Sequence, residues 1–290
     1  MIPPPFDYHA PATLPEAVAL LGRFGDEAKI LSGGQSLLPL LKLRFASPAH
    51  LIDIGRIPGL DYIKEDGGFL KIGALVREAA LESSSLIRSK YPILTDTAAV
   101  IADPIVRNLA TVAGNLAHGD PANDHPATML ALGAEVVATG PKGARVIPLT
   151  AFFTGIFSTA LEPTEVLSEI RIPVPPPQSG GAYVKLERKV GDFATAGAAA
   201  FLVLKGDVIE RAQIGLTNVG PTPLRATDAE KALAGKKADA AAFSQAATLA
   251  ASATRPTADR RGKEDYKKEM ARVLTARALA KAAARALGGK

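Results

Sequence analysis

A cluster of proline and glycine divides this sequence of 290 residues. Residues 173–181 read Pro-Val-Pro-Pro-Pro-Gln-Ser-Gly-Gly. Such a run breaks both helix and sheet. Proline has no N–H donor for their hydrogen bonds, and glycine loses more backbone conformational freedom than any other residue when it is ordered. Helical and extended patterns alternate before it, whereas three extended stretches and then helices follow it. This order predicts an α+β protein in two parts, because a regular α/β sheet would alternate throughout.

The first part is predicted to divide again near Ile57–Leu60. Thr13-Leu-Pro-Glu16 is typical of a capping box that opens a helix through Leu21. The other elements predicted in residues 1–57 are strands at 29–31 and 50–54 and a helix at 37–43. In residues 58–176 we expect hairpins at 62–72 and 135–148 and helices near 77–81, 91–101 and 124–132. Residues 177–290 are predicted to form strands at 182–189, 198–205 and 210–218, followed by helices from about residue 227.

Composition excludes several kinds of site. The chain has no Cys, which rules out a disulfide framework, a thiolate zinc site, an all-Cys iron–sulfur cluster and a Cys nucleophile. It has four His, and no apolar run reaches the roughly 18 residues that a membrane span needs. The start Met1-Ile-Pro-Pro-Pro lacks the features of a secretory signal, so we expect a cytoplasmic protein.

Positive charge is concentrated near the C-terminus. Residues 255–290 hold eleven Lys and Arg against four Asp and Glu, although the whole chain has a net charge of +5. The segment Glu264–Leu287 is rich in Ala and predicts a helix with one packed face and one solvated basic face. Docking on an acidic partner remains an alternative. Nucleic-acid binding is disfavoured, because no aromatic residues alternate with the charges.

Common nucleotide and hydrolase motifs are absent. The sequence contains no G-x-G and therefore no dinucleotide fingerprint, and it has neither a P-loop nor a G-x-S-x-G elbow.

Two other glycine-containing loops are present instead, Ser32-Gly33-Gly34-Gln35-Ser36 and Thr111-Val-Ala113-Gly114-Asn115. Adjacent small residues let the backbone N–H groups approach an anion closely, so the two loops could hold a pyrophosphate between them. A purely structural turn is the alternative for each loop.

Two further segments carry candidate ligand-binding residues. His118-Gly-Asp120-Pro-Ala-Asn123-Asp124-His125-Pro126 has no common metal-ligand spacing, and no nucleophile motif accompanies its His and Asp residues. Asp124 is predicted either to cap a helix or to bind a ligand's hydroxyl groups. In the segment Tyr183–Ala194, Lys185 could pair with a ligand anion and Phe193 could pack on a planar ring. A solvated strand face is the alternative for that segment.

Together these motifs resemble the FAD-binding medium subunits of the xanthine dehydrogenase family of molybdenum hydroxylases, and among them those of the aerobic carbon monoxide dehydrogenases. The resemblance runs along the whole chain. The matching stretches are Ala28–Arg44, His50–Ile54, Ile101–Asn108, Thr111–Asn115, His118–Pro126, Lys185–Ala194 and Leu216–Asn218.

The resemblance implies a fold and a set of site residues. Residues 1–57 and 58–176 would be the two subdomains of a flavin-binding unit of the PCMH, or vanillyl-alcohol-oxidase, type. Residues 177–290 would carry a three-stranded antiparallel sheet and a helical bundle. The pyrophosphate would lie on the two glycine loops, with Ile101, Asp124, Leu167, Lys185 and Phe193 around the rest of the cofactor. The full implied set is Ser32, Gly33, Gly34, Gln35, Ser36, Ile101, Thr111, Ala113, Gly114, Asn115, Asp124, Leu167, Lys185 and Phe193, with no catalytic residue and no metal ligand.

The resemblance also implies partners. Substrate would be oxidised at molybdopterin on a large subunit, and two [2Fe–2S] clusters on a small subunit would carry electrons to FAD on this chain. The acceptor would be a quinone, a cytochrome, NAD or O₂, and the complex would be a dimer of heterotrimers. A subunit of an aldehyde, purine or N-heterocycle dehydrogenase, a stand-alone flavin oxidoreductase and a flavin-free scaffold remain as alternatives.

Three positions depart from the family pattern. Ser32 and Gln35 replace the usual Ala and the frequent His of the first loop, and Ala113 replaces a Gly of the second. Alanine is tolerated in the second loop only if its φ is negative, because a Cβ atom at positive φ meets the backbone.

Overall fold

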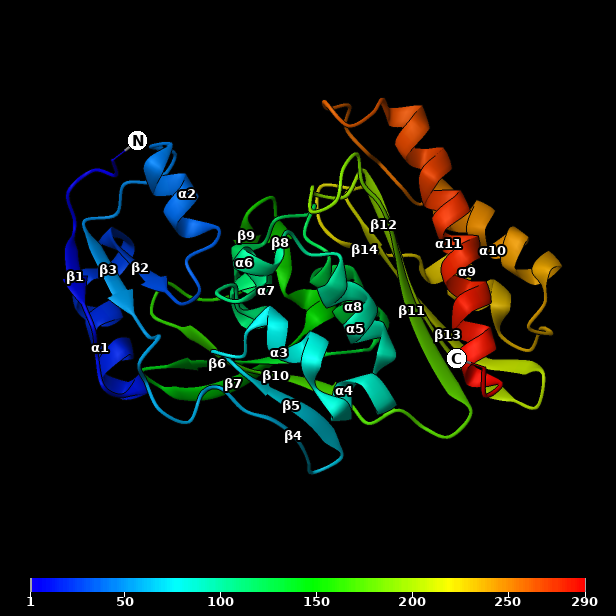
Figure 1. The fold of residues 1–290 in the computed structure, drawn as a ribbon, viewed down its shortest axis with the longest axis horizontal. Coiled ribbons are helices and arrows are strands. Elements are labelled where there is room, and N and C mark those ends of the chain that lie inside the picture. The colour runs from blue at the N-terminus through cyan, green and yellow to red at the C-terminus, as the bar shows by residue number, and fades with distance from the viewer. Residues whose placement is uncertain (1, 290) are drawn as a thin grey trace.

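Three larger sheets follow one another along the molecule, with a small two-stranded sheet besides them, in a computed structural model that describes residues 2–289. Figure 1 shows the N-terminal unit at one end, a larger antiparallel sheet in the middle and the long C-terminal helix against the last sheet.

The N-terminal unit is a small parallel sheet with the order β1-β3-β2. Thr13 caps its first helix as predicted: the Thr13 hydroxyl accepts a hydrogen bond from the N–H of Glu16, and the Glu16 carboxylate accepts one from Ala12. Its elements are β1 (Asp7–His9), α1 (Leu14–Phe24), η1 (Gly25–Glu27), β2 (Ala28–Leu31), α2 (Leu37–Lys42) and β3 (His50–Asp53). Val18, Leu21 and Ile52 are buried in a separate core cluster, to which Leu75 and Val166 of the middle part also contribute.

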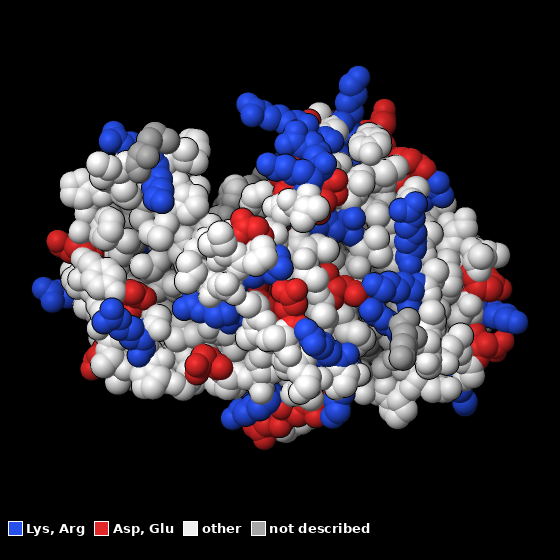
Figure 2. All heavy atoms as spheres, in the orientation of Figure 1, with Lys and Arg blue, Asp and Glu red and all other residues white. Residues whose placement is uncertain are grey.

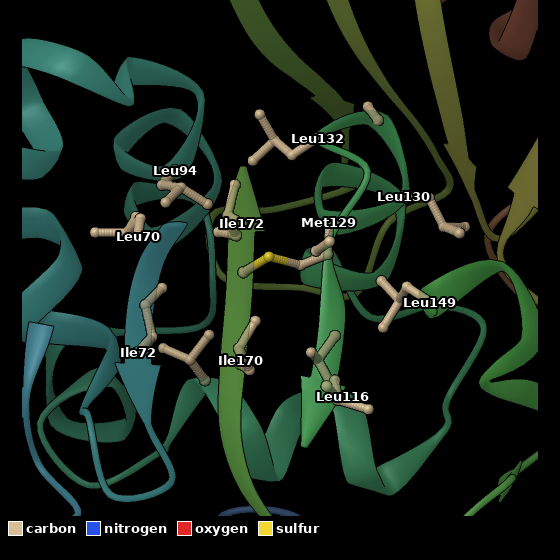
Figure 3. Close-up of a cluster of buried hydrophobic side chains, with 14 of the residues drawn as sticks. Leu70, Ile72, Leu94, Leu116, Met129, Leu130, Leu132, Leu149, Ile170 and Ile172 are labelled. Carbon is tan, nitrogen blue, oxygen red and sulfur yellow. The ribbon is translucent and has the colours of Figure 1, made fainter. Parts of the chain in front are cut away.

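The middle sheet is antiparallel, with the order β4-β5-β10-β6-β7. Its strands are β4 (Ile63–Asp66), β5 (Phe69–Gly73), β6 (Glu135–Gly140), β7 (Gly143–Pro148) and β10 (Val166–Pro173). The chain around it forms α3 (Glu78–Ser83), α4 (Ser85–Lys90), α5 (Pro92–Ala99), α6 (Pro104–Arg107), α7 (Val112–His118), α8 (His125–Ala131), η2 (Leu149–Ala151), β8 (Phe153–Gly155) and β9 (Ser158–Thr159). Figure 3 shows Ile72 and Ile170 of this sheet in one buried cluster with Leu116 of α7 and Met129 of α8.

The C-terminal sheet is covered on both faces. It has the order β11-β12-β13-β14, with β11 (Ser179–Leu186), β12 (Ala196–Lys205), β13 (Val208–Thr217) and the two-residue edge strand β14 (Leu224–Arg225). Successive residues of β12 point to opposite faces, so Ala198 and Ala200 enter the core beneath the helices, whereas Ala199 and Phe201 join the core of the middle sheet. The covering helices are α9 (Thr227–Leu233), α10 (Ala240–Ser252) and α11 (Glu264–Ala286).

Close backbone contact explains the small residues of this sheet. A Cβ atom on Gly180 of β11 would lie 2.2 Å from the carbonyl oxygen of Ala282, and one on Gly215 of β13 would lie 2.0 Å from that of Ala127. Helix α11 therefore lies directly on β11, and α8 lies on the opposite face of the sheet against β13.

The α+β class and the predicted long elements are confirmed. The segment Thr111–Asn115, expected as a loop, instead opens the helix α7, and the short helices α4 and α6 and the central strand β10 were not expected. The C-terminal sheet has a fourth short strand, β14, beyond the three that were predicted. Helix α11 has the predicted packed face, with Leu274 and Leu279 buried. Its Lys267 is also buried. The ammonium group can be buried because it pairs with the Asp259 carboxylate at 2.7 Å. Across residues 2–289, no helix is long and apolar enough to cross a membrane.

Candidate functional site

A cleft of about 500 Å³ lies between the N-terminal unit and the middle sheet. Its volume falls within the usual range for cofactor and small-molecule pockets. Ten of the predicted site residues line it: Ser32, Gly33, Gly34, Gln35, Ser36, Thr111, Ala113, Gly114, Asn115 and Leu167. The two glycine-containing segments, far apart in the sequence, therefore face the same space, as predicted.

The first wall is the turn that joins β2 to α2. In the part of the chain that the structure describes, none of the backbone N–H groups of residues 32–36 has a protein acceptor. Gly33 lies so close to the second wall that a Cβ atom there would be 2.2 Å from the carbonyl oxygen of Leu109, and Gly34 has a positive φ of 72°. This wall consequently offers a row of backbone donors that an anion can use.

The second wall is the first turn of α7. The Thr111 hydroxyl accepts a hydrogen bond from the N–H of Gly114 and lies 3.1 Å from the Ser32 hydroxyl, which joins the two walls. Ala113 is not among the residues with positive φ, so its Cβ atom is tolerated in place of a glycine. The side-chain oxygen of Asn115 is buried without a hydrogen-bond partner, which leaves it for a ligand.

The other four predicted residues do not line this cleft. Ile101, Asp124, Lys185 and Phe193 belong to a neighbouring region instead. The Lys185 ammonium group donates to the Asp124 carboxylate at 3.0 Å and to the carbonyl oxygen of Val100, which precedes Ile101, at 2.9 Å. Asn123 links the two regions, because its side-chain amide donates to the carbonyl oxygen of Asn115 at 2.9 Å.

The Asp124 side chain accepts no hydrogen bond from a backbone N–H group of α8, and it does not face solvent. Asp124 occupies the predicted N-cap position of α8, but its side chain makes no capping hydrogen bond. The carboxylate is buried and accepts hydrogen bonds from the Tyr183 hydroxyl and from Lys185. Burial raises the pKa of the Asp124 carboxyl, and the Lys185 and Tyr183 groups oppose that effect. Burial and the Asp124 charge also raise the pKa of the Tyr183 hydroxyl.

Phe193 stands at the exposed side of the same region. The residue is 47% exposed, and the Arg261 guanidinium group lies 5.5 Å from the centroid of its ring. The turn before it is pressed against the chain at Ile101: a Cβ atom on Gly191 would lie 2.9 Å from the carbonyl oxygen of Ala102. Figure 2 shows basic side chains gathered at the edge of the molecule where the 253–263 loop and the start of α11 lie.

Sequence reasoning missed several residues of the cleft. His118 and Phe157 face each other there, with ring centroids 5.1 Å apart, and Asp26, Lys29, Glu162 and Glu165 also line it. Burial lowers the pKa of the His118 imidazole. The one sequence signal for His118 is its place in the segment His118–Pro126, whose spacing fits no common metal site. Among residues 2–289 there is no group of three His, Asp or Glu placed to hold a metal ion.

Family comparisons match both parts of the chain. Residues 4–175 match the family described as FAD binding domain in molybdopterin dehydrogenase, and residues 181–282 match the CO dehydrogenase flavoprotein C-terminal domain. The chain is 48% identical to the carbon monoxide dehydrogenase medium chain of Hydrogenophaga pseudoflava, over 98% of this chain and 99% of that one. It is 38% identical to 6-hydroxypseudooxynicotine dehydrogenase complex subunit alpha of Paenarthrobacter nicotinovorans, over 99% and 97% of the two chains.

Solved structures give the same result. The structure of carbon monoxide dehydrogenase from Hydrogenophaga pseudoflava lacking the Mo-pyranopterin moiety matches with a TM-score of 0.96 and 50% identity, over 98% of this chain and 99% of that one. Quinoline 2-oxidoreductase from Pseudomonas putida 86 matches with a TM-score of 0.93 and 35% identity, over 99% and 100%. The cleft suits FAD, because it offers backbone donors for a pyrophosphate and an unpaired Asn115 oxygen. The chain belongs to the FAD-binding medium subunits of the carbon monoxide dehydrogenase-like molybdenum hydroxylases, an oxidoreductase family that includes xanthine dehydrogenase.

Proposed function

We propose that this chain is the flavin-holding medium subunit of a heterotrimer and passes electrons from substrate oxidation to an external acceptor. Its partners would be a small subunit with two [2Fe–2S] clusters and a large subunit with molybdopterin, assembled as a dimer of heterotrimers. The acceptor would be a quinone, a cytochrome, NAD or O₂. The observation that carries this proposal is the cleft, in which the unpaired N–H groups of residues 32–36 face the first turn of α7.

The residues of the chain would bind and orient the cofactor. When bound, FAD supplies hydride and single-electron chemistry that no side chain of this protein provides. The N–H groups of Ser32–Ser36 and the first turn of α7 would hold the pyrophosphate, since consecutive backbone donors suit an anion. Asn115 would use its unpaired oxygen to accept a hydrogen bond, and Leu167 would pack on an apolar part of the cofactor.

The neighbouring region would complete the site around the flavin ring. Ile101 and Phe193 would approach the ring, and the buried Asp124 and Lys185 would set the local field. We assign no acid–base role to any residue of this chain. Its tasks are to hold the cofactor, to shield one side of it and to leave an edge open to the partners.

We also propose that the domain boundaries lie at residues 57/58 and 176/177, which limited proteolysis with mass mapping would test.

Carbon monoxide is the substrate that we propose for the whole complex. Relatives 48% and 47% identical over nearly the full chain are medium chains of carbon monoxide dehydrogenase. Other relatives are subunits of glyceraldehyde, caffeine and xanthine dehydrogenases, so the same subunit role with an aldehyde, a purine or an N-heterocycle is the second candidate. Assaying the purified complex with each substrate class, with a dye as acceptor, would separate the two.

The test of the cofactor is a visible absorption spectrum. The full chain, purified alone and titrated with FAD, should retain a flavin band through desalting. The complex purified from its own cell is measured in parallel, because partner subunits that bind the folded chain also stabilise it. Absence of flavin from both samples would refute the proposal. Reduction of the flavin by substrate with this chain alone would instead indicate a stand-alone flavin oxidoreductase.

A further inference from the structure

A buried Glu–His pair lies behind the second wall of the cleft. The Glu78 carboxylate and the His125 imidazole are 2.6 Å apart, and both side chains have no exposed surface. Glu78 is the first residue of α3 and His125 is the first residue of α8. Neither residue lines the cleft, and neither has a part in the proposed function.

The pair is costly for the fold. One oxygen of Glu78 and the second ring nitrogen of His125 are buried without a hydrogen-bond partner. Buried polar atoms without partners destabilise the folded state, and replacing both members of such a pair by apolar side chains often leaves stability unchanged or raises it. Stability alone therefore does not explain why the pair is present.

Its surroundings connect it to the cofactor cleft. On the Glu78 side, the Glu78 N–H donates to the carbonyl oxygen of Ala110 at 3.0 Å, and the Val112 N–H donates to that of Val76 at 3.1 Å. These two bonds hold the start of α7. On the His125 side, Asn123 donates to the carbonyl oxygen of Asn115 at 2.9 Å, farther along the same helix.

The Glu78–His125 contact closes this set of contacts into a ring. It joins the segment that holds the start of α7 to the segment that holds Asn115. With the contact in place, the first turn of α7 keeps one position relative to Asp124. Asp124 is the residue after Asn123, and its carboxylate binds Lys185. Without it, both supports of α7 persist, but nothing polar fixes them to each other at this point.

Building on the proposed function, we infer that Glu78 and His125 are positioning residues of the FAD site. They fix the first turn of α7, with its Thr111 and Asn115, against the Asp124 region. The pair contributes to the geometry of the site and not to the stability of the chain.

The test removes both members together. In the variant Glu78→Leu/His125→Phe, the core stays filled and no charge is left unpaired. The matched control is Thr97→Val/Thr128→Val, because these two threonine hydroxyls are also fully buried, lie 2.7 Å apart and join α5 to the same helix α8 away from the cleft. For each full chain, the FAD dissociation constant is measured by fluorescence titration and the unfolding temperature is measured without FAD.

We expect the Glu78→Leu/His125→Phe variant to unfold within a few degrees of the wild type while its FAD dissociation constant rises at least tenfold. The threonine control should keep a dissociation constant within twofold of the wild type. An unchanged dissociation constant in the Glu78→Leu/His125→Phe variant would overturn the inference.

A second variant covers the case in which the double variant does not fold. Glu78→Gln keeps the shape of the side chain and replaces its carboxyl group by an amide, and we expect it to weaken FAD binding several-fold more than the threonine control. Equal FAD binding by the two would show a structural role only and would overturn the inference. If the wild-type chain and the wild-type complex both fail to bind FAD, the proposed function fails first, and that result is distinct from either of these.

Discussion

Gly33 is a residue at which the first wall of the cleft lies close against the chain that leads into the second. In Gly33→Ala, the new Cβ atom would lie 2.2 Å from the carbonyl oxygen of Leu109, a separation that real Cβ atoms do not adopt, so the walls must move apart. We expect the FAD dissociation constant to rise at least tenfold, measured by fluorescence titration. The control is Gly22→Ala in α1, where a Cβ atom meets nothing within 4 Å.

Gly22→Ala should leave FAD binding unchanged and stabilise α1 by up to about 1 kcal/mol, because alanine is the better helix former. If Gly33→Ala binds FAD as tightly as this control does, then close approach of the backbone is not what the cleft requires of that position.

Asp192 links the Phe193 turn to the C-terminal part of the chain. The Arg261 guanidinium group, 2.7 Å from the carboxylate, together with Arg188 lowers the pKa of Asp192 to about 2. An acid with a lowered pKa stabilises the fold at pH values above its unfolded pKa, near 3.9. That contribution is lost as the pH falls from about 4 toward 2.

We therefore expect Asp192→Asn to lower the free energy of unfolding by about 1 kcal/mol at pH 6, a small value because solvent screens ion pairs near the surface. The difference from the wild type should shrink as the pH falls below about 4. Urea unfolding at several pH values measures it, and Arg261→Gln should reproduce most of the effect. A difference that stays constant with pH would mean that the charge of Asp192 contributes nothing.

At the scale of elements, Asp96 of α5 ties the middle sheet to the C-terminal helix. Its carboxylate accepts hydrogen bonds from both terminal nitrogens of Arg285, at 2.6 and 3.0 Å, and from Lys281 at 2.9 Å, all on α11. Hydrogen bonds between charged partners contribute about 1.5–3 kcal/mol each when they are partly buried, although such bonds are not additive. This contact acts together with the close packing of α11 on β11.

We expect Asp96→Asn to lower the free energy of unfolding by about 2 kcal/mol, measured by urea unfolding. The matched control is a pair within α11, the helix that Asp96 contacts. There Glu269 pairs at the surface with Arg272, three residues farther along the chain. Glu269→Gln should change stability much less than Asp96→Asn does, because exposed pairs contribute little. Equal effects of the two substitutions would argue against a special role for the α5–α11 contact.

The elements also show which parts of the structure the sequence can predict. The capped helix α1, the two hairpins and the three long strands have local signals, namely a Thr–Glu capping box, glycine turns and runs of β-forming residues. Helix α7 has a capping Thr111 but also Gly114, which weakens a helix, so its sequence favours a loop. Its helical form depends on tertiary bonds such as that from Val112 to Val76, which no local pattern encodes.

The cleft shows the same limit. Ser32 and Thr111 are 79 positions apart in the sequence, yet their hydroxyl groups lie 3.1 Å apart. The type of residue in each glycine-containing segment indicates a backbone surface for an anion, but the pairing of the segments comes from the fold. Residue chemistry indicated that the two segments could hold a pyrophosphate between them but favoured a structural turn for each loop taken alone, and the resemblance to a family is what predicted the pairing. Phe157 had no local signal, because its place in the cleft depends on a turn with a positive φ of 53°.

At the scale of the whole molecule, the cleft is built by two units whose buried residues form two separate clusters, although Leu75 and Val166 of the middle part also enter the N-terminal cluster. Ser32–Ser36 belong to the N-terminal unit around Val18 and Ile52, and α7 belongs to the core around the middle sheet. A ligand that contacts both walls binds only when both units are folded and in place. Binding to the folded state alone stabilises it by an amount that grows with ligand concentration.

FAD should therefore raise the stability of the whole chain. With free FAD at 100 times its dissociation constant, the expected gain in the free energy of unfolding is about 2.7 kcal/mol, which urea unfolding with and without FAD measures. Gly22→Ala should gain as much as the wild type, and Gly33→Ala should gain much less at the same FAD concentration. A unit that unfolds in a separate transition and does not respond to FAD would show that this unit is not part of the site. Because each wall comes from a different unit, one common FAD-dependent transition would mean that the cofactor holds the two units together.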